Sequence, residues 1–213
     1  MLSVTRPYPS WLPWLLLLAG IVLAGALGGA FLARSLDPQP PPLSNGAWLP
    51  EPRRIADFTL TDGQGRDFGL AELHGQASLL FFGFTRCPDV CPATLAQLAA
   101  VQRALPALRV VFVSVDPQHD TPEALGHYVR AFHPSLIAVT GAAEAREPLE
   151  RSLTTTSMRV ALPDGSDTYD HSAALYLLDR EARWVASFRP PFMTEPLVAD
   201  LRAALLRLGR DGR

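Results

Sequence analysis

The chain has 213 residues, of which 48% are hydrophobic and 19% are charged, and its formal net charge is −2. This length suits one membrane or targeting segment plus a single domain, and the composition is too apolar for a disordered chain. The small net charge argues against a broad nucleic-acid-binding surface. All 19 basic residues are arginines, which excludes mechanisms that need a lysine amine. Because Cys87 and Cys91 are the only cysteines, a disulfide-stapled scaffold and a four-cysteine zinc site are also excluded.

The first predicted element is a membrane anchor. No charge interrupts the chain from Trp11 to Ala33, and about 20 apolar residues suffice to cross a bilayer as a helix. The small residues Ala26–Ala30 could imitate a signal-peptide cleavage site. A cleaved signal peptide usually has a shorter apolar region of about 7–15 residues, so we favour an uncleaved anchor over residues 1–36.

Six prolines follow between positions 38 and 52, and they predict an extended, semi-rigid linker over residues 37–54.

Residues 55–213 show alternating strand and helix patterns. The first predicted elements are a hairpin (Asp57–Leu60 and Asp67–Leu70), a buried strand (Ala77–Phe84) and a helix with Pro92 in its first position. A strand (Arg109–Val115), a helix capped by Thr121 and running to about Phe132, a strand (Leu136–Thr140) and a helix (Ala143–Leu153) follow. The last predicted elements are two strands (Ala173–Leu178 and Trp184–Phe188) and a helix that Thr194 caps and Gly209 ends. Strands separated by helices imply a parallel centre, and the short final link implies an antiparallel pair. The order predicts an α/β fold, a thioredoxin-like sandwich with an N-terminal transmembrane helix.

Cys87 and Cys91 follow the predicted strand Ala77–Phe84, at the sheet edge where ligands bind in open α/β folds. Four residues apart, the two cysteines can meet in one turn, where they can form a disulfide or present two sulfurs to one metal. We expect both thiols to be more acidic than a free cysteine, because Cys91 lies at a helix N-terminus and Arg86 adds positive charge. A pair of inert buried cysteines would not explain their place at this edge.

The histidines decide whether these cysteines form a metal site. His171 immediately precedes the strand Ala173–Leu178, and in a thioredoxin-like architecture the loop that enters this strand faces the cysteine loop. We therefore predict His171 as a third ligand. Two thiolates with one imidazole suit Cu(I) and also accept Cu(II), whereas structural zinc needs four ligands. The remaining histidines are expected to be solvated or bonded locally: His74, His119, His127 and His133.

Nearby aspartates are expected to support the site without acting as ligands. Asp170, beside His171, could orient the imidazole or lie near the metal. Asp116 and Asp120 are expected to cap the turn before the Thr121 helix.

Three segments together resemble the Sco/SenC family of copper chaperones of cytochrome c oxidase assembly. They are FTRCPDVCP (Phe84–Pro92), VSVDP with DTP (Val113–Pro117 and Asp120–Pro122) and DHS (Asp170–Ser172). The resemblance covers about residues 55–208.

The resemblance implies a thioredoxin-like domain, residues 55–213, that binds copper through Cys87, Cys91 and His171. It also implies an N-terminal tether in the inner membrane, with the domain on the non-cytoplasmic, periplasmic side. The implied acceptor of the copper is the binuclear copper centre in subunit II of cytochrome c oxidase. The resemblance names no copper donor.

Three functions compete for this site. The expected one is a metallochaperone, not an enzyme, that passes copper on by ligand exchange. The alternative is a thiol–disulfide oxidoreductase that reduces the cysteines of the acceptor site. Such reductases usually separate their cysteines by two residues, whereas three separate them here, and His171 lies where a proline is expected. A thiol peroxidase with Cys87 as nucleophile would explain neither the position of Cys91 nor His171.

Overall fold

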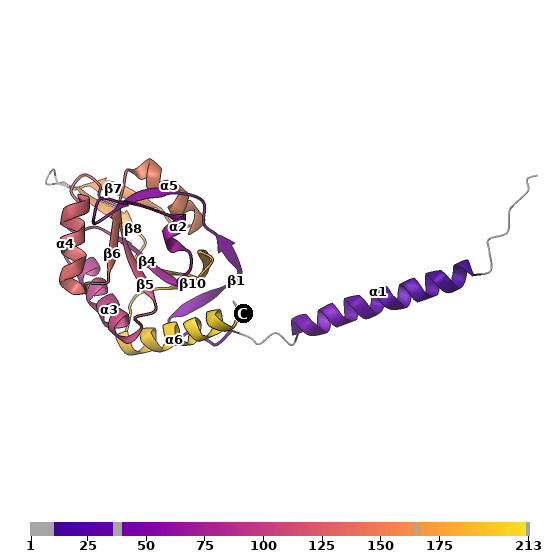
Figure 1. Cartoon of the computed structure of the whole chain (residues 1–213). Helices are drawn as coiled ribbons and strands as arrows, with labels where there is room; N and C mark the ends of the chain where they lie inside the picture. Colours follow the sequence, from indigo (N-terminus) through magenta and orange to yellow (C-terminus); the bar gives the residue numbers. More distant parts are fainter. Residues whose placement is uncertain (1–10, 36–39, 164, 166, 212–213) are drawn as a thin grey trace, which may run out of the picture. The chain divides into compact units, whose positions relative to one another are not determined.

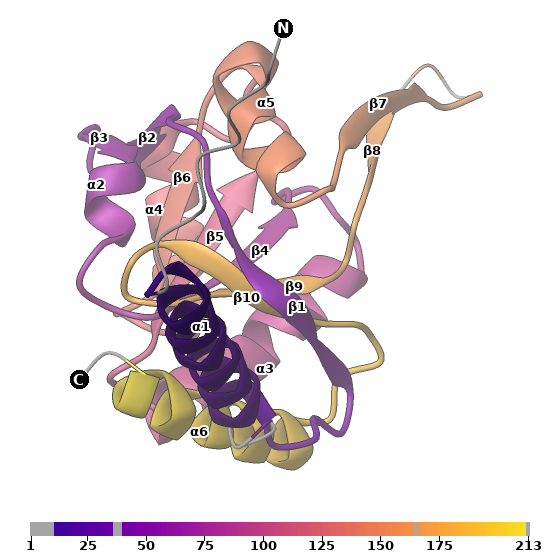
Figure 2. The same ribbon diagram turned by 90° about the vertical axis from the view of Figure 1, so that its right-hand side faces the viewer.

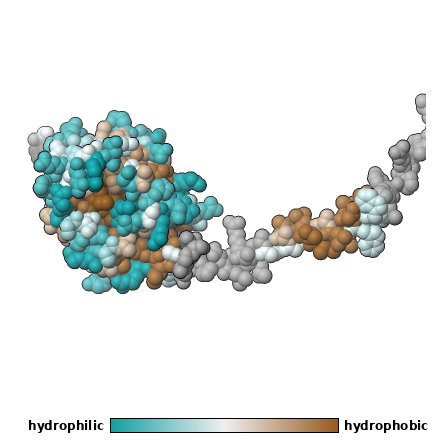
Figure 3. All heavy atoms as spheres, viewed as in Figure 1, coloured by the Kyte–Doolittle hydropathy of each residue, from teal (hydrophilic) through white to brown (hydrophobic). Residues whose placement is uncertain are grey.

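The computed structural model describes residues 11–35, 40–163, 165 and 167–211 (Figure 1). The chain divides into two compact units, residues 1–40 and 41–213. In the first unit, α1 (Leu12–Ser35) contains a stretch, Leu12–Gly29, that is long and apolar enough to cross a membrane. Figure 3 shows this stretch as mostly hydrophobic. The predicted N-terminal helix is thus confirmed as a candidate membrane span.

The second unit is built on an eight-stranded sheet with the strand order β1-β10-β9-β4-β5-β6-β2-β3. Its strands are β1 (Gly46–Arg54), β2 (Thr59–Asp62), β3 (Asp67–Gly69), β4 (Ser78–Gly83), β5 (Arg109–Ser114), β6 (Ile137–Thr140), β9 (Leu175–Leu178) and β10 (Arg183–Phe188). Strands β4, β5 and β6 are parallel, and β9 and β10 form an antiparallel pair. The predicted parallel centre and antiparallel final pair are therefore confirmed.

Among its described residues this unit has five helices: α2 (Leu70–Leu73), α3 (Val90–Ala104), α4 (Pro122–Phe132), α5 (Ala143–Ser152) and α6 (Thr194–Asp211). Apolar side chains of α3, α4 and α6 pack on one face of the sheet, and those of α2 and α5 pack on the other. Successive residues of a strand point to opposite faces, so Phe81 joins the first core and Phe82 the second. The result is the predicted thioredoxin-like α/β sandwich.

Helix boundaries follow the predicted signals in part. Thr121 caps α4 by accepting a hydrogen bond from the backbone of Ala124 (3.4 Å), and Pro122 takes the first turn, as predicted. Helix α3 begins at Val90, so Pro92 occupies its third position rather than its first. The prediction that Gly209 ends the last helix is wrong, because α6 continues to Asp211. A glycine costs a helix only about 1 kcal/mol, and the buried face of α6 outweighs that cost.

The predicted linker is wrong from Gly46 onward, where the chain forms the edge strand β1. Gly46–Trp48 pair with β10, and the pairing resumes at Arg53 and Arg54 after a register shift. Pro50 and Pro52 lie within that shift, where a missing N–H breaks no ladder bond. Of the earlier part of the linker, residues 36–39 lie outside the described residues.

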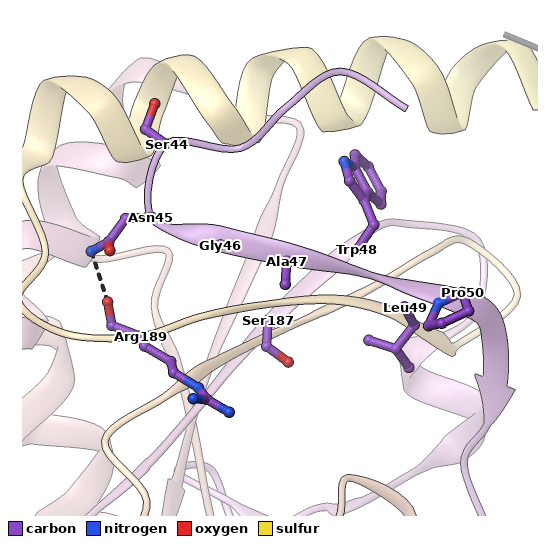
Figure 4. A pocket seen from close by; sticks show the side chains of 9 residues that line it. All are labelled: Ser44, Asn45, Gly46, Ala47, Trp48, Leu49, Pro50, Ser187 and Arg189. Atoms are coloured by element: carbon purple, nitrogen blue, oxygen red, sulfur yellow. Dashed lines mark hydrogen bonds between the residues drawn. The ribbon is translucent and has the colours of Figure 1, made fainter. Parts of the chain in front are cut away.

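A surface pocket of about 530 Å³ lies along β1 and β10 (Figure 4). The side chain of Asn45, which lines the pocket, donates to the carbonyls of Arg189 (2.7 Å) and Pro191 (2.6 Å). The residues that line this pocket include none of the predicted metal ligands. It therefore belongs to the β1 edge and not to the predicted site.

A second, two-stranded sheet was not predicted from the sequence. It consists of β7 (Ser157–Ala161) and β8 (Asp167–His171), which pair antiparallel. Figure 2 shows this hairpin projecting from the sandwich, separate from the main sheet. Met158 and Val160 are exposed on it, so the usual alternation of buried and exposed residues is missing. The last residue of β8 is His171, so the hairpin carries one predicted ligand.

Candidate functional site

The cysteine loop leaves the buried strand β4 at Gly83 and enters α3. Cys91 is the second residue of α3 and is fully buried, while Cys87 in the loop is partly exposed. A Cβ atom on Gly83 would lie 2.9 Å from the Cys91 sulfur and 2.7 Å from a ring carbon of Phe112. Real Cβ atoms do not approach that closely, so only glycine lets the sulfur sit against the strand.

The structure brings Cys91 and His171 together, although 80 positions separate them in the chain. The Cys91 Sγ lies 3.8 Å from Nε2 of His171, and Nδ1 of the same ring lies 3.1 Å from the carbonyl oxygen of Ser172. A carbonyl only accepts, so this contact assigns the proton to Nδ1 and leaves the Nε2 lone pair facing the sulfur. Burial lowers the pKa of His171 and favours the neutral ring. The Nε2 atom of His171 is thus free of a proton and oriented so that its lone pair could bind a metal ion.

Cys87 packs against the core cluster that contains Cys91. Both cysteines are free thiols. Within the part of the chain that the structure describes, no three His, Cys, Asp or Glu side chains form a group that could hold a metal as they stand. The three predicted ligands are thus not gathered around one point as they stand, and the closest measured approach among them is that between Cys91 and His171.

The predicted acidity of Cys91 is wrong. Burial raises the pKa of its thiol to about 12, and the neighbouring Cys87 and Asp120 add to the effect, although a hydrogen bond with the Phe84 backbone opposes it. The helix N-terminus does not compensate for the lost solvation. The charge of Arg86 is directed elsewhere, because its guanidinium donates to Asp116 (Nη2–Oδ2 3.0 Å).

Two buried aspartates hold the cysteine loop. Asp120 accepts hydrogen bonds from the backbone (3.1 Å) and the hydroxyl of Thr85, and from the Ser114 hydroxyl (2.5 Å). Asp116 accepts from Arg86 and faces His119 Nδ1 at 2.9 Å. Both carboxylates are fully buried.

From the sequence, these two aspartates are expected only to cap the following turn. The backbone of Asp116 does close that turn, since its carbonyl accepts from the Asp120 amide (2.9 Å). The side chains instead fasten the cysteine loop to the end of β5. The signal that could have revealed this role is their position directly after a buried strand parallel to β4, at the same sheet edge as the cysteines.

Aromatic packing and a backbone carbonyl position the imidazole. The Phe84 ring packs edge-on against His171 with centroids 5.9 Å apart, and it also contacts Tyr169 at 5.6 Å. Asp170, which was expected to orient the imidazole or lie near the metal, is exposed and acts on His171 through its charge, while the hydrogen bond at Nδ1 is made with the carbonyl of Ser172.

The other histidines lie where solvation or local bonding was expected. His119 is bonded to Asp116, and Nδ1 of His133 accepts from the Ser135 backbone (3.2 Å). His74 and His127 are exposed.

Comparisons with known proteins agree with this fold. The SCO1/SenC family matches residues 49–206. The mitochondrial SCO2 homolog of Bos taurus is 37% identical over 199 residues, which cover 88% of this chain and 73% of the relative. Bradyrhizobium japonicum ScoI, solved with copper bound, is 35% identical, covers 70% of this chain and 98% of its own, and has a TM-score of 0.64. The apo Sco1 protein of Thermus thermophilus is 36% identical, covers 75% of this chain and 95% of its own, and has a TM-score of 0.66. The chain therefore belongs to the SCO1/SenC family.

Proposed function

We propose that this protein is a membrane-anchored copper metallochaperone that binds copper through Cys87, Cys91 and His171. In this proposal it delivers the copper to the binuclear centre in subunit II of cytochrome c oxidase. The Sco family is a family of cytochrome c oxidase assembly proteins, and several Sco structures have copper bound. The ligand set, the cargo and the acceptor are what the proposal adds for this chain.

The observation that carries the proposal is the contact between Cys91 and His171. A buried sulfur and an unprotonated imidazole nitrogen lie 3.8 Å apart, and Cys87 packs against the core cluster that contains the buried sulfur. Soft sulfur donors with one nitrogen are a donor set suited to copper in both oxidation states. The Nδ1 contact with the Ser172 carbonyl is the kind of outer contact that fixes a metal-binding imidazole.

The three side chains suit transfer because they differ in accessibility. Cys91 is fully buried, whereas Cys87 and His171 are only partly buried. An acceptor cysteine can reach the outer ligands first and replace them one at a time. Cys91 would then be the last donor to release the copper ion.

The domain organisation and the location belong to the same proposal. Helix α1 would anchor the chain in the inner membrane, and the domain after the linker would face the periplasm. A reporter fused after Arg213 should then be active only outside the cytoplasm. Activity restricted to the cytoplasm would contradict this orientation.

Copper binding by the reduced chain tests the ligand set. Cys87→Ser and Cys91→Ser should each abolish tight Cu(I) binding, and oxidation of the pair to a disulfide should do the same. His127→Ala, which changes an exposed histidine on α4, is the matched control for His171→Ala. If either cysteine variant keeps full copper stoichiometry and affinity, the site lies elsewhere.

The alternative function is a thiol–disulfide oxidoreductase, and the two free thiols on one loop and the following helix turn favour it. Disulfide exchange needs an attacking thiolate, a resolving thiol and access, but no imidazole. We therefore expect His171→Ala to weaken copper binding by tenfold or more, about 1.4 kcal/mol per factor of ten, while the reduction rate of a model disulfide stays unchanged. Unchanged copper affinity with collapsed reduction would instead make the oxidoreductase the primary function.

A further inference from the structure

Arg146 on α5 is a buried arginine close to both halves of the site. Its side chain is 3% exposed and pairs with Glu150 (Nε–Oε1 2.8 Å), which is also buried. A buried ion pair is costly unless further hydrogen bonds satisfy it, and this guanidinium has three more acceptors within 3.4 Å. None of these three acceptors belongs to α5, so the arginine connects the helix to other elements.

One connection reaches the base of the hairpin that carries His171. Nη2 of Arg146 donates to the hydroxyl of Ser157 (3.0 Å), and that hydroxyl donates to Glu150 (2.6 Å). Ser157 is the residue of β7 directly opposite His171 in the register of the hairpin. Directly opposite residues share a face and lie close together. The Arg146–Glu150 pair thus binds the strand residue that lies beside the ligand.

The other connections reach the ends of the parallel strands. Nη1 of Arg146 lies 3.2 Å from the carbonyl of Gly141, which follows β6, and 3.4 Å from the carbonyl of Ser114, which ends β5. The Ser114 hydroxyl donates to Asp120, and Asp120 accepts the two hydrogen bonds from Thr85. Ser114 is therefore shared between the support of the cysteine loop and the support of the hairpin.

We propose that Arg146 is a positioning residue that sets the place of the His171 imidazole relative to the two cysteine sulfurs. The inference rests on the proposed copper site and adds the residue that holds its two sides in register. Only the forked guanidinium can reach Glu150, Ser157 and the strand-end carbonyls together. A lysine at this position would keep the charge but not the fork.

Ser157→Ala is the sharpest variant, because it removes the link to the hairpin and leaves the Arg146–Glu150 pair in place. We expect Cu(II) affinity to fall roughly tenfold, at the lower end of the 10- to 100-fold that outer contacts of metal ligands contribute. The sulfur-to-copper charge-transfer band of the Cu(II) form should shift as well. Arg146→Lys should show the same two changes, because charge alone should not restore the site.

Ser152→Ala is the matched control. Ser152 is also partly buried and its hydroxyl also makes two hydrogen bonds, to the Pro148 carbonyl (2.7 Å) and from the Ala56 amide (2.9 Å), but neither reaches the hairpin. We expect this variant to keep the copper affinity and the absorption band of the unchanged protein. Thermal unfolding of each metal-free variant shows whether stability alone explains any difference.

The outcomes separate this inference from the proposed function. If Ser157→Ala and Arg146→Lys match the unchanged protein in Cu(II) affinity and absorption band, Arg146 has only a structural role and the inference is wrong. If Ser152→Ala loses as much Cu(II) affinity as Ser157→Ala, the inference is also wrong. If a Cys87→Ser, Cys91→Ser double variant binds copper as well as the unchanged protein, the proposed function fails and the inference fails with it.

Discussion

The two sides of the candidate site are built in different ways. Cys91 lies in the first turn of α3 with its sulfur in the core against β4, and a buried carboxylate fastens the preceding loop to the end of β5. His171 ends a two-stranded hairpin that stands apart from the main sheet and carries exposed side chains on β7. One proposed ligand is therefore fixed by the packing of the whole domain, and the other by aromatic contacts, a backbone carbonyl and the link from Ser157 to Arg146. We expect ligand exchange to begin on the hairpin side.

The largest expected contrast is in stability. Phe112 is 1% exposed and packs in the core beside Cys91, so Phe112→Ala should lower the free energy of unfolding by about 3–5 kcal/mol. Met158 is 63% exposed on the hairpin, so Met158→Ala should change the free energy of unfolding by less than about 0.5 kcal/mol. Urea unfolding of the domain measures both. Similar losses in the two variants would mean that the hairpin is as much a part of the core as α3.

Gly83→Ala tests how tightly the core holds Cys91. The added methyl would crowd the Cys91 sulfur and Phe112, and overpacking of this kind costs about 1–3 kcal/mol. Copper affinity should fall as well, because the sulfur must move. Gly209→Ala on α6 is the control: its Cβ meets nothing within 4 Å, and helix propensity should add up to about 1 kcal/mol of stability. Unchanged copper affinity in Gly83→Ala would show that the sulfur has room to shift.

Asp120→Asn tests the polar support of the cysteine side. An amide cannot accept from both groups of Thr85 and from Ser114 as the carboxylate does, so we expect a loss of about 1–3 kcal/mol in stability and weaker copper binding. Asp179→Asn is a matched control, because Asp179 is also buried and accepts hydrogen bonds from two backbone amides and Arg183, but at the opposite end of the sheet. Its variant should lose stability and keep copper affinity. If Asp120→Asn and Asp179→Asn weaken copper binding equally, the effect of Asp120→Asn does not come from its contacts with the cysteine loop.

The smallest expected effect concerns the hairpin itself. A hydrogen bond from Arg159 is the main reason that the pKa of Asp167 lies below its ordinary value. The stabilisation from this pair is therefore present above the ordinary pKa of the carboxyl and disappears as the pH falls through the lowered one. Hydrogen-exchange protection of the hairpin amides should fall slightly over that acidic range, and Asp167→Asn should remove the pH dependence. Protection that is the same at both ends of the range in the unchanged protein would contradict this.

Elements whose residues are close together in the sequence were predicted correctly, because runs of apolar residues and helix-capping residues can be recognised without knowing the tertiary structure. The apolar runs of β4 and β5 and the Thr121 cap of α4 are examples. Strand β1 was missed because its pairing with β10 joins residues more than 100 positions apart, and its prolines indicate a linker. The acidity of Cys91 was wrong because burial depends on Gly83, on Phe112 and on how the whole sheet packs. The juxtaposition of Cys91 and His171 was predictable only through the expected sandwich, which places the two segments at one edge.

The edge strand β1 has a further consequence, for self-association. Open sheet edges invite pairing with a second chain, and prolines, charges and short strands discourage it. On β1, Pro50 and Pro52 interrupt the row of donors and Glu51 adds a charge, while the opposite edge, β3, has only three residues. Copies of the domain that are crowded together at a membrane, as we propose, would therefore resist joining their sheets into a continuous aggregate.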